Sequence, residues 1–168
     1  MRALIVAVLF LLPASACDSG NYLGETGSFE LSAPALSTSI KGRASFRAQS
    51  GLEFAVFLDG SSGSVVLVSP TEGVPRRGTY AVEMDRRTMD ARSYRIEFSP
   101  SGGGFYRSES GSVTIKKSSE RRVEGRFEFV ARSFNEGAGG EAITISGKFE
   151  AVPYVRPLIG YDLAAVER

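Results

Sequence analysis

The chain contains no histidine and no tryptophan, and it has a single cysteine, Cys17. Without histidine it has no Ser-His-Asp or Cys-His triad, and one thiol cannot build a zinc site from imidazole or thiolate ligands. The chain also lacks an excess of one charge, because 20 Lys and Arg stand against 19 Asp and Glu. This balance argues against a polyanionic partner such as nucleic acid. We therefore expect no metal and no cofactor.

Motifs of the common catalytic and nucleotide-binding sites are also missing. The sequence has no P-loop, GxGxxG, GxSxG or HExxH spacing. Its glycine clusters at 102–104 and 137–140 do not lead into a helical pattern whose N-terminus would hold a phosphate. With 168 residues, of which 42% are hydrophobic, the chain is long enough for one domain with a sizeable core. We expect a non-enzymatic protein.

The first sixteen residues have the pattern of an export signal. Arg2 provides the positive charge, residues 3–12 are apolar, and Pro13 ends this stretch before Ala14-Ser15-Ala16. The apolar stretch is shorter than the ~20 residues that a membrane-spanning helix needs. We therefore interpret residues 1–16 as a signal peptide that is removed.

Cys17 follows this segment directly, and here the sequence resembles a bacterial lipoprotein precursor, in which such a cysteine receives a lipid and becomes the mature N-terminus. A general signal peptidase could cut the same bond, because Ala14 and Ala16 are small. Lipidation of Cys17 is favoured because a lone free thiol has no partner in an oxidising compartment. Residues 17–27 are then the lipidation site and a flexible tether. The resemblance implies a location in the bacterial cell envelope, facing the periplasm or the exterior.

From residue 28 onward, apolar and polar residues alternate. Val123, Phe127 and Phe129 share one parity, while charged residues take the other, which is typical of a half-buried antiparallel strand. Similar segments, separated by Gly, Ser, Asp and Pro, recur through the chain, and 52–58 and 65–68 are apolar enough to be buried on both sides. We predict an all-β domain over 28–153, an antiparallel sandwich or flattened up-and-down barrel of about 8–10 strands. The segment 154–168 is a C-terminal tail that either adds a last strand or docks elsewhere.

Three short segments place a glycine two residues before an aromatic residue: Gly78-Thr79-Tyr80, Gly125-Arg126-Phe127 and Gly147-Lys148-Phe149. A missing side chain leaves room for a neighbouring ring on a curved sheet. The succession of the segments 111–115, 122–129 and 143–150 is similar to the C-terminal half of a group of small bacterial envelope lipoproteins of unknown function with an all-β domain, and the similarity covers residues 78–151. The resemblance implies a fold but no catalytic residue.

Basic residues form the one uneven charge feature, a predicted basic binding rim. It consists of Arg86, Arg87, Arg92, Lys116, Lys117, Arg121 and Arg122. In a simple meander, alternate loops meet at one end, which places 85–92 beside 116–122 and opposite the end where the tether enters. Such a rim suits anionic lipid headgroups, a cell-wall polymer or an envelope protein. The alternative, solubilising and edge-protecting charge, is favoured by the near-zero net charge. Aromatic residues are not interleaved with these cations as nucleic-acid binding requires.

Three functions from different classes fit these observations. The first is a lipid-anchored envelope protein whose β-domain binds or scaffolds another component. The second is a lipocalin-like carrier of a small apolar ligand. Its cavity would be lined by Phe46, Phe54, Phe57, Tyr80, Phe98, Phe127, Phe129 and Phe149. The third and least favoured is an acid-pair hydrolase using two of Glu97, Glu124, Glu128 and Glu150, for which cross-strand ion pairing is the better explanation.

Overall fold

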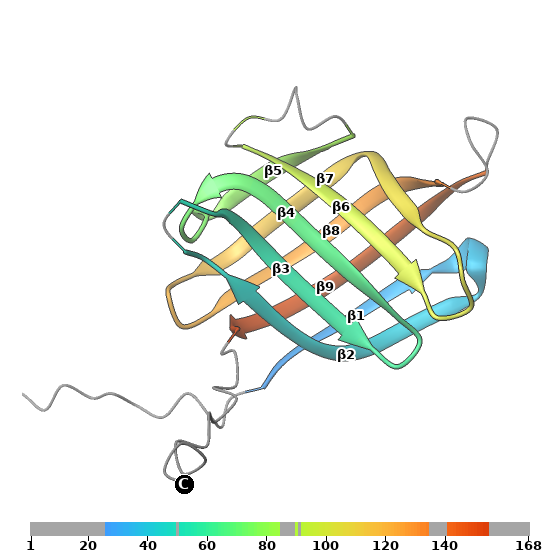
Figure 1. Cartoon of the computed structure of the whole chain (residues 1–168), viewed down its shortest axis with the longest axis horizontal. Coiled ribbons are helices and arrows are strands. Elements are labelled where there is room, and N and C mark those ends of the chain that lie inside the picture. Colours follow the sequence, from blue (N-terminus) through green and yellow to red (C-terminus); the bar gives the residue numbers. More distant parts are fainter. Residues whose placement is uncertain (1–25, 50, 85–89, 91, 135–140, 155–168) are drawn as a thin grey trace, which may run out of the picture.

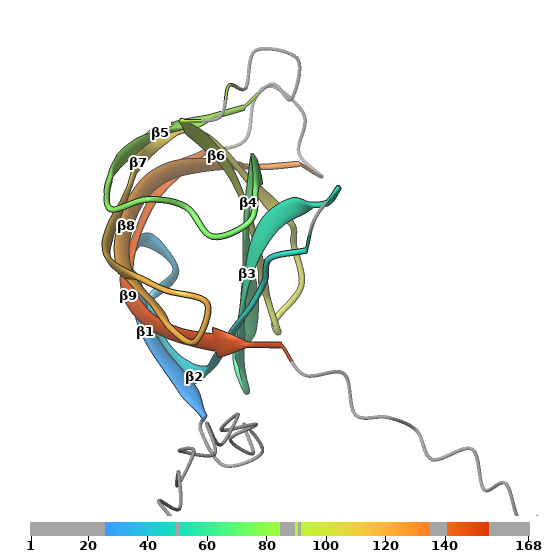
Figure 2. The ribbon, with the colours of Figure 1, turned by 90° about the vertical axis from the view of Figure 1, so that its left-hand side faces the viewer.

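The computed structural model describes residues 26–49, 51–84, 90, 92–134 and 141–154. Nine strands form one mixed sheet that closes on itself as a barrel, in the order β1-β2-β3-β4-β6-β5-β7-β8-β9 (Figures 1 and 2). This confirms the predicted all-β class and strand number. The strands are β1 (Gly27–Ala33), β2 (Thr38–Arg47), β3 (Glu53–Gly60), β4 (Gly63–Glu72), β5 (Gly78–Glu83), β6 (Ser93–Pro100), β7 (Tyr106–Ser118), β8 (Val123–Ser133) and β9 (Ala142–Pro153), with a short 3-10 helix η2 (Pro34–Leu36) between β1 and β2.

The core is the inside of the barrel, and side chains from alternate positions along each strand fill it. In β8, the inward positions Val123, Phe127 and Phe129 are at most 3% exposed, while the intervening residues face outward. The other strands contribute alternate residues in the same way, so one hydrophobic cluster occupies the interior. The outer faces of β3 and β4 are less completely covered than predicted, because Phe57, Val66 and Val68 are half-buried.

Two of the three glycine–aromatic segments form a reciprocal contact between β8 and β9. Gly125 lies opposite Phe149, and Phe127 lies opposite Gly147. Each ring covers the glycine of the neighbouring strand, and the two rings stack with centroids 6.5 Å apart. This is the arrangement that the spacing predicts. Gly78 differs, because it pairs with Ile115 rather than with an aromatic residue.

The barrel departs from a simple meander at β5. Strand β4 pairs with β6, and β5 lies between β6 and β7, parallel to β6. β6 and β7 pair directly only at Glu97↔Arg107 and Phe98↔Tyr106. Where they separate, the buried Ser108 hydroxyl accepts a hydrogen bond of 3.0 Å from the Ile96 amide. This bond satisfies a main-chain donor at the point where the ladder between β6 and β7 ends.

Candidate functional site

Both ends of the described barrel meet at one end of the molecule, which we call the tether end. Gly27, where β1 begins, pairs with Ala44 of β2. Two residues further along β2, the Phe46 carbonyl accepts a 2.7 Å hydrogen bond from the Tyr154 amide, just after β9 ends. The connections from β2 to β3, β4 to β5 and β7 to β8 lie at this end, because the flanking strands are antiparallel. The segment that carries Cys17 therefore joins the barrel at the tether end.

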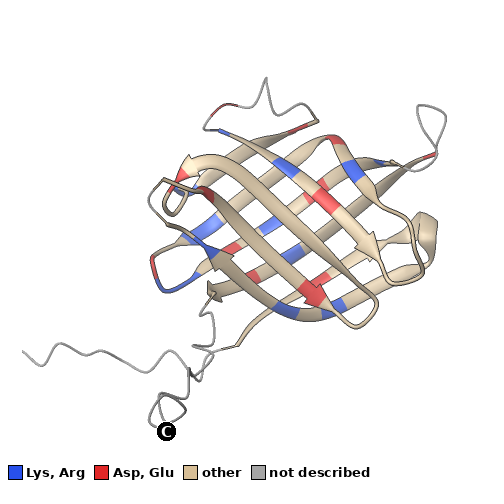
Figure 3. Cartoon of the chain, viewed as in Figure 1, with Lys and Arg blue, Asp and Glu red and all other residues tan. Residues whose placement is uncertain are grey.

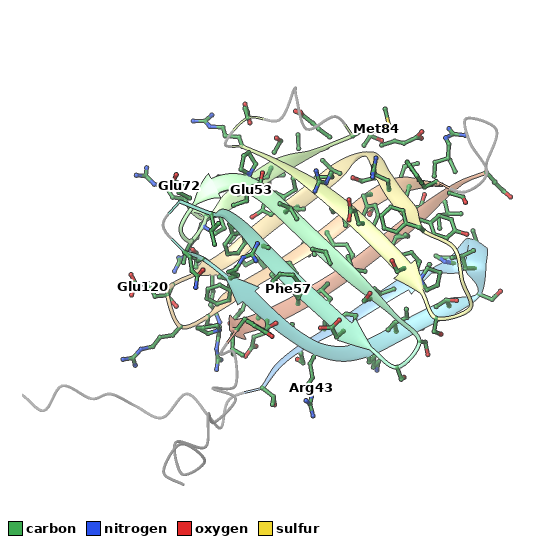
Figure 4. All side chains as sticks on the ribbon, in the orientation of Figure 1. Arg43, Glu53, Phe57, Glu72, Met84 and Glu120 are labelled. Carbon is green, nitrogen blue, oxygen red and sulfur yellow. The ribbon has the colours of Figure 1, made fainter. Side chains whose placement is uncertain are left out.

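Four of the seven predicted rim residues lie on one hairpin at the tether end. Lys116 and Lys117 lie near the end of β7, and Arg121 and Arg122 are in the turn that leads into β8, beside Glu120 (Figure 4). Arg92 precedes β6. Arg86, Arg87 and Cys17 lie outside the described residues.

The predicted position of the rim is wrong for its hairpin part, 116–122. A register row runs Lys117↔Glu124↔Glu150↔Ser28, so the basic hairpin lies three strands from the start of β1, at the tether end and not opposite it. The connection after β5 leaves the sheet beside Ser110, whereas β5 begins beside Ile115 near the hairpin. The physical reason is topological. The insertion of β5 parallel to β6 breaks the alternation of loops that a meander would give.

The structure adds basic residues to this end that the sequence did not connect with the hairpin. Arg76 and Arg77 are exposed in the connection between β4 and β5. Two hydrogen bonds hold this connection, one from the Ser118 hydroxyl to the Pro75 carbonyl and one of 2.6 Å from the Tyr80 hydroxyl to the Arg76 carbonyl. In the sequence, Arg76 and Arg77 are marked only as a basic pair that follows a proline. Their position beside the hairpin depends on the strand order.

Charge is distributed unequally between the two ends of the barrel. The connections at the far end that the structure describes in full, residues 34–37, 61–62 and 101–105, contain no Lys or Arg (Figure 3). At the tether end, acids partly compensate the cations. Lys117 pairs with Glu124 at 2.8 Å, and Arg122 pairs with Glu150 at 2.8 Å. Glu53 and Glu72, paired across β3 and β4, and Glu120 add negative charge there.

Arg76, Arg77 and Lys116 lie on neighbouring segments at this end, in the connection between β4 and β5 and near the end of β7. All three are exposed, and none forms an ion pair with a residue that the structure describes. We call Arg76, Arg77 and Lys116 the basic patch. Burial raises the pKa of the Tyr80 phenol, and the guanidinium groups of Arg76 and Arg92 oppose this shift.

The candidate acids for hydrolysis lie on the outside of the barrel, beside cations. Glu97 is 3.4 Å from Arg95 and 3.9 Å from Arg107, measured from each Nε to the same carboxylate oxygen. Glu124 and Glu150 pair with Lys117 and Arg122 as described above. Such contacts are those expected of cross-strand ion pairs on a wet face. Among the described residues, no group of three or more Cys, Asp or Glu is placed to hold a metal ion.

The aromatic residues proposed for a ligand cavity are mostly packed against each other. Phe46 and Phe54 have ring centroids 5.9 Å apart, and Tyr80 meets Tyr94 edge to face at 5.4 Å. The prediction that Phe57 lines an interior cavity is wrong, because its side chain faces outward (Figure 4). The Arg47 guanidinium lies 5.8 Å from its ring centroid. This packing favours a solid core over a ligand-holding interior.

Tyr94 is the one large buried side chain whose polar atom stands out. Its side chain is 0% exposed, and its hydroxyl has no hydrogen-bond partner in the described structure. Burial, with a smaller contribution from the neighbouring Tyr80, raises the pKa of this phenol far above its ordinary value. This shift favours the neutral form of the phenol.

Among the described residues, no helix is long and apolar enough to cross a membrane. Comparison of the chain with protein-family models, with curated proteins and with solved structures gives no match.

Proposed function

We propose that this protein is a lipid-anchored protein of the bacterial cell envelope, with a lipid on Cys17 and a non-enzymatic β-barrel domain that binds or scaffolds another envelope component. The support from the sequence is the export pattern of residues 1–16 and the lone cysteine that follows it. The support from the structure is the position of the first strand, which begins at Gly27, ten residues after Cys17.

The observation that carries the proposal is that the start of β1, which the tether precedes, and the basic patch share one end of the barrel. A segment of ten residues spans at most ~35 Å when fully extended. A lipid on Cys17 would therefore hold Arg76, Arg77 and Lys116 close to the membrane surface. Anionic headgroups attract each Lys or Arg near the surface by ~1 kcal/mol, and the attraction decays over about one Debye length. The tether end is thus the membrane-facing end of the domain.

This orientation predicts salt-dependent binding to anionic vesicles even without the lipid. We expect the mature chain carrying Cys17→Ser to bind vesicles of equal parts phosphatidylglycerol and phosphatidylcholine, and not vesicles of phosphatidylcholine alone. Replacing Arg76, Arg77 and Lys116 together by Gln should weaken this binding roughly a hundredfold, because three contributions of ~1 kcal/mol are lost. Vesicle sedimentation at increasing salt concentration measures the effect.

A matched variant separates position from net charge. Replacing Lys41, Arg126 and Lys148 by Gln removes three exposed positive charges from the wall of the barrel, on β2, β8 and β9. This variant should bind the anionic vesicles nearly as well as the parent chain. Equal losses in the two triple variants would show that overall charge, and not the tether end, determines binding, and would overturn the proposed orientation.

A further inference from the structure

The outer face of β7, β8, β9, β1 and β2 contains a hollow of about 820 Å³. None of the residues of the basic patch lines it. Its walls are outward-facing side chains arranged in two register rows across the five strands. The first row is Thr114, Arg126, Lys148, Glu30 and Lys41. The second row is Ser112, Glu128, Ser146, Ser32 and Ser39. We call this hollow the wall groove. It combines a predominantly cationic row with a row rich in hydroxyl groups.

The cationic row is not electrically balanced. Arg126 and Lys148 are direct cross-strand partners, and like charges in such positions are unfavourable. Glu30 pairs with Lys148 at 2.7 Å and with Lys41 at 3.8 Å, and the Lys148 ammonium lowers the pKa of this carboxyl. Arg126 forms no ion pair with any described residue, although Glu124 and Glu128 flank it on its own strand. An anionic group bound beside Arg126 and Lys148 would relieve this repulsion.

Other classes of ligand fit the wall groove poorly. A peptide cannot add as a strand, because each of these five strands is paired on both sides in the closed barrel. An amphipathic helix or an apolar ligand would need exposed apolar surface, whereas the lining residues Leu31 and Phe127 are each 3% exposed. A single-stranded nucleic acid would need exposed rings for stacking, and Glu30 and Glu128 would repel its closely spaced phosphates. What remains is a hydroxyl-rich chain with widely spaced acidic groups.

We propose that the wall groove binds an acidic glycan chain, of the kind in which every second sugar carries a free carboxylate, as in peptidoglycan glycan strands from which the stem peptides have been removed. Lys148 and Lys41 lie on strands separated by β1, so about two strand spacings, ~10 Å, divide their main chains, and both ammonium groups lean toward Glu30 between them. This strand separation is close to the length of one disaccharide unit. The carboxylates pair with Arg126, Lys148 and Lys41, while the second row exchanges hydrogen bonds with sugar hydroxyls. Glu128 is an acceptor in that row.

The test is a titration of the mature chain carrying Cys17→Ser with a soluble tetrasaccharide of alternating N-acetylglucosamine and N-acetylmuramic acid. We expect backbone amide shifts in nuclear magnetic resonance spectra to concentrate in β1, β8 and β9. A neutral chitin tetrasaccharide should bind at least tenfold more weakly, because it lacks the carboxylates. Arg126→Gln should weaken binding of the acidic tetrasaccharide about tenfold, as expected when one charge-assisted contact is lost.

Arg76→Gln is the matched control, because it removes one exposed guanidinium from the tether end and leaves the wall groove intact. It should bind the acidic tetrasaccharide as the parent chain does. The inference is overturned if the tetrasaccharide produces no shifts in these strands, if the neutral sugar binds equally well, or if Arg126→Gln binds unchanged. This inference does not depend on the lipid anchor, so either proposal can fail while the other stands.

Discussion

Gly147→Ala is expected to destabilise the barrel by about 1–3 kcal/mol, the usual cost of overpacking a filled core. A Cβ at this position would lie 2.5 Å from Cζ of Phe127, 2.7 Å from the carbonyl oxygen of Glu30 and 2.9 Å from Cβ of Leu31. The ring could shift, but the main-chain oxygen belongs to the ladder between β9 and β1. The change in the midpoint of urea unfolding, followed by circular dichroism, measures the loss.

Two further variants identify the cause of this loss. Gly102→Ala should be close to neutral, because a Cβ there meets nothing within 4 Å. Adding Phe127→Leu to Gly147→Ala removes the ring atom at 2.5 Å, so the second substitution should cost less in the alanine background than in the parent chain. If Gly147→Ala unfolds at the parent midpoint, the close packing of rings on glycines is not a source of stability in this barrel.

Cys17→Ser is expected to move the protein from the membrane fraction to the soluble envelope fraction. Each buried methylene of a lipid chain contributes ~0.8 kcal/mol to membrane affinity, and the basic patch alone supplies only a reversible, salt-sensitive attraction. Cell fractionation with a high-salt wash, followed by immunoblotting, distinguishes the two contributions. The parent protein should stay with the membranes after the wash.

Ser19→Ala is a suitable control for this experiment, because it alters the same segment and keeps the cysteine. It should fractionate as the parent protein does. If Cys17→Ser stays with salt-washed membranes, a lipid on Cys17 is not what retains the protein there.

Periodicity predicted the strands because each follows from local alternation. The predicted strand around Val123 and Phe129 is β8, and the predicted domain of 28–153 differs from the observed span of strands by one residue, at Gly27. The position of β8 and the bounds of the domain follow from the alternation of apolar and polar residues along each strand, which can be read from the local sequence.

Strand order and register are not determined by the local sequence of each strand. The parallel pairing of β5 with β6 depends on how the sheet closes, so the relative position of the basic segments could not be predicted. The register shift between Ile115 and Lys117 breaks the alternation where the basic hairpin begins. The wall groove was missed for the same reason, because its rows join Lys41 and Arg126 from distant parts of the chain.

The measurement that tests the account most directly is the intact mass of the protein purified from membranes. We expect a chain that begins at Cys17 and carries the added mass of acyl chains, with fragmentation placing that mass on the first residue. A chain that begins at Cys17 with the unmodified mass of residues 17–168, or one that retains residues 1–16, would contradict it.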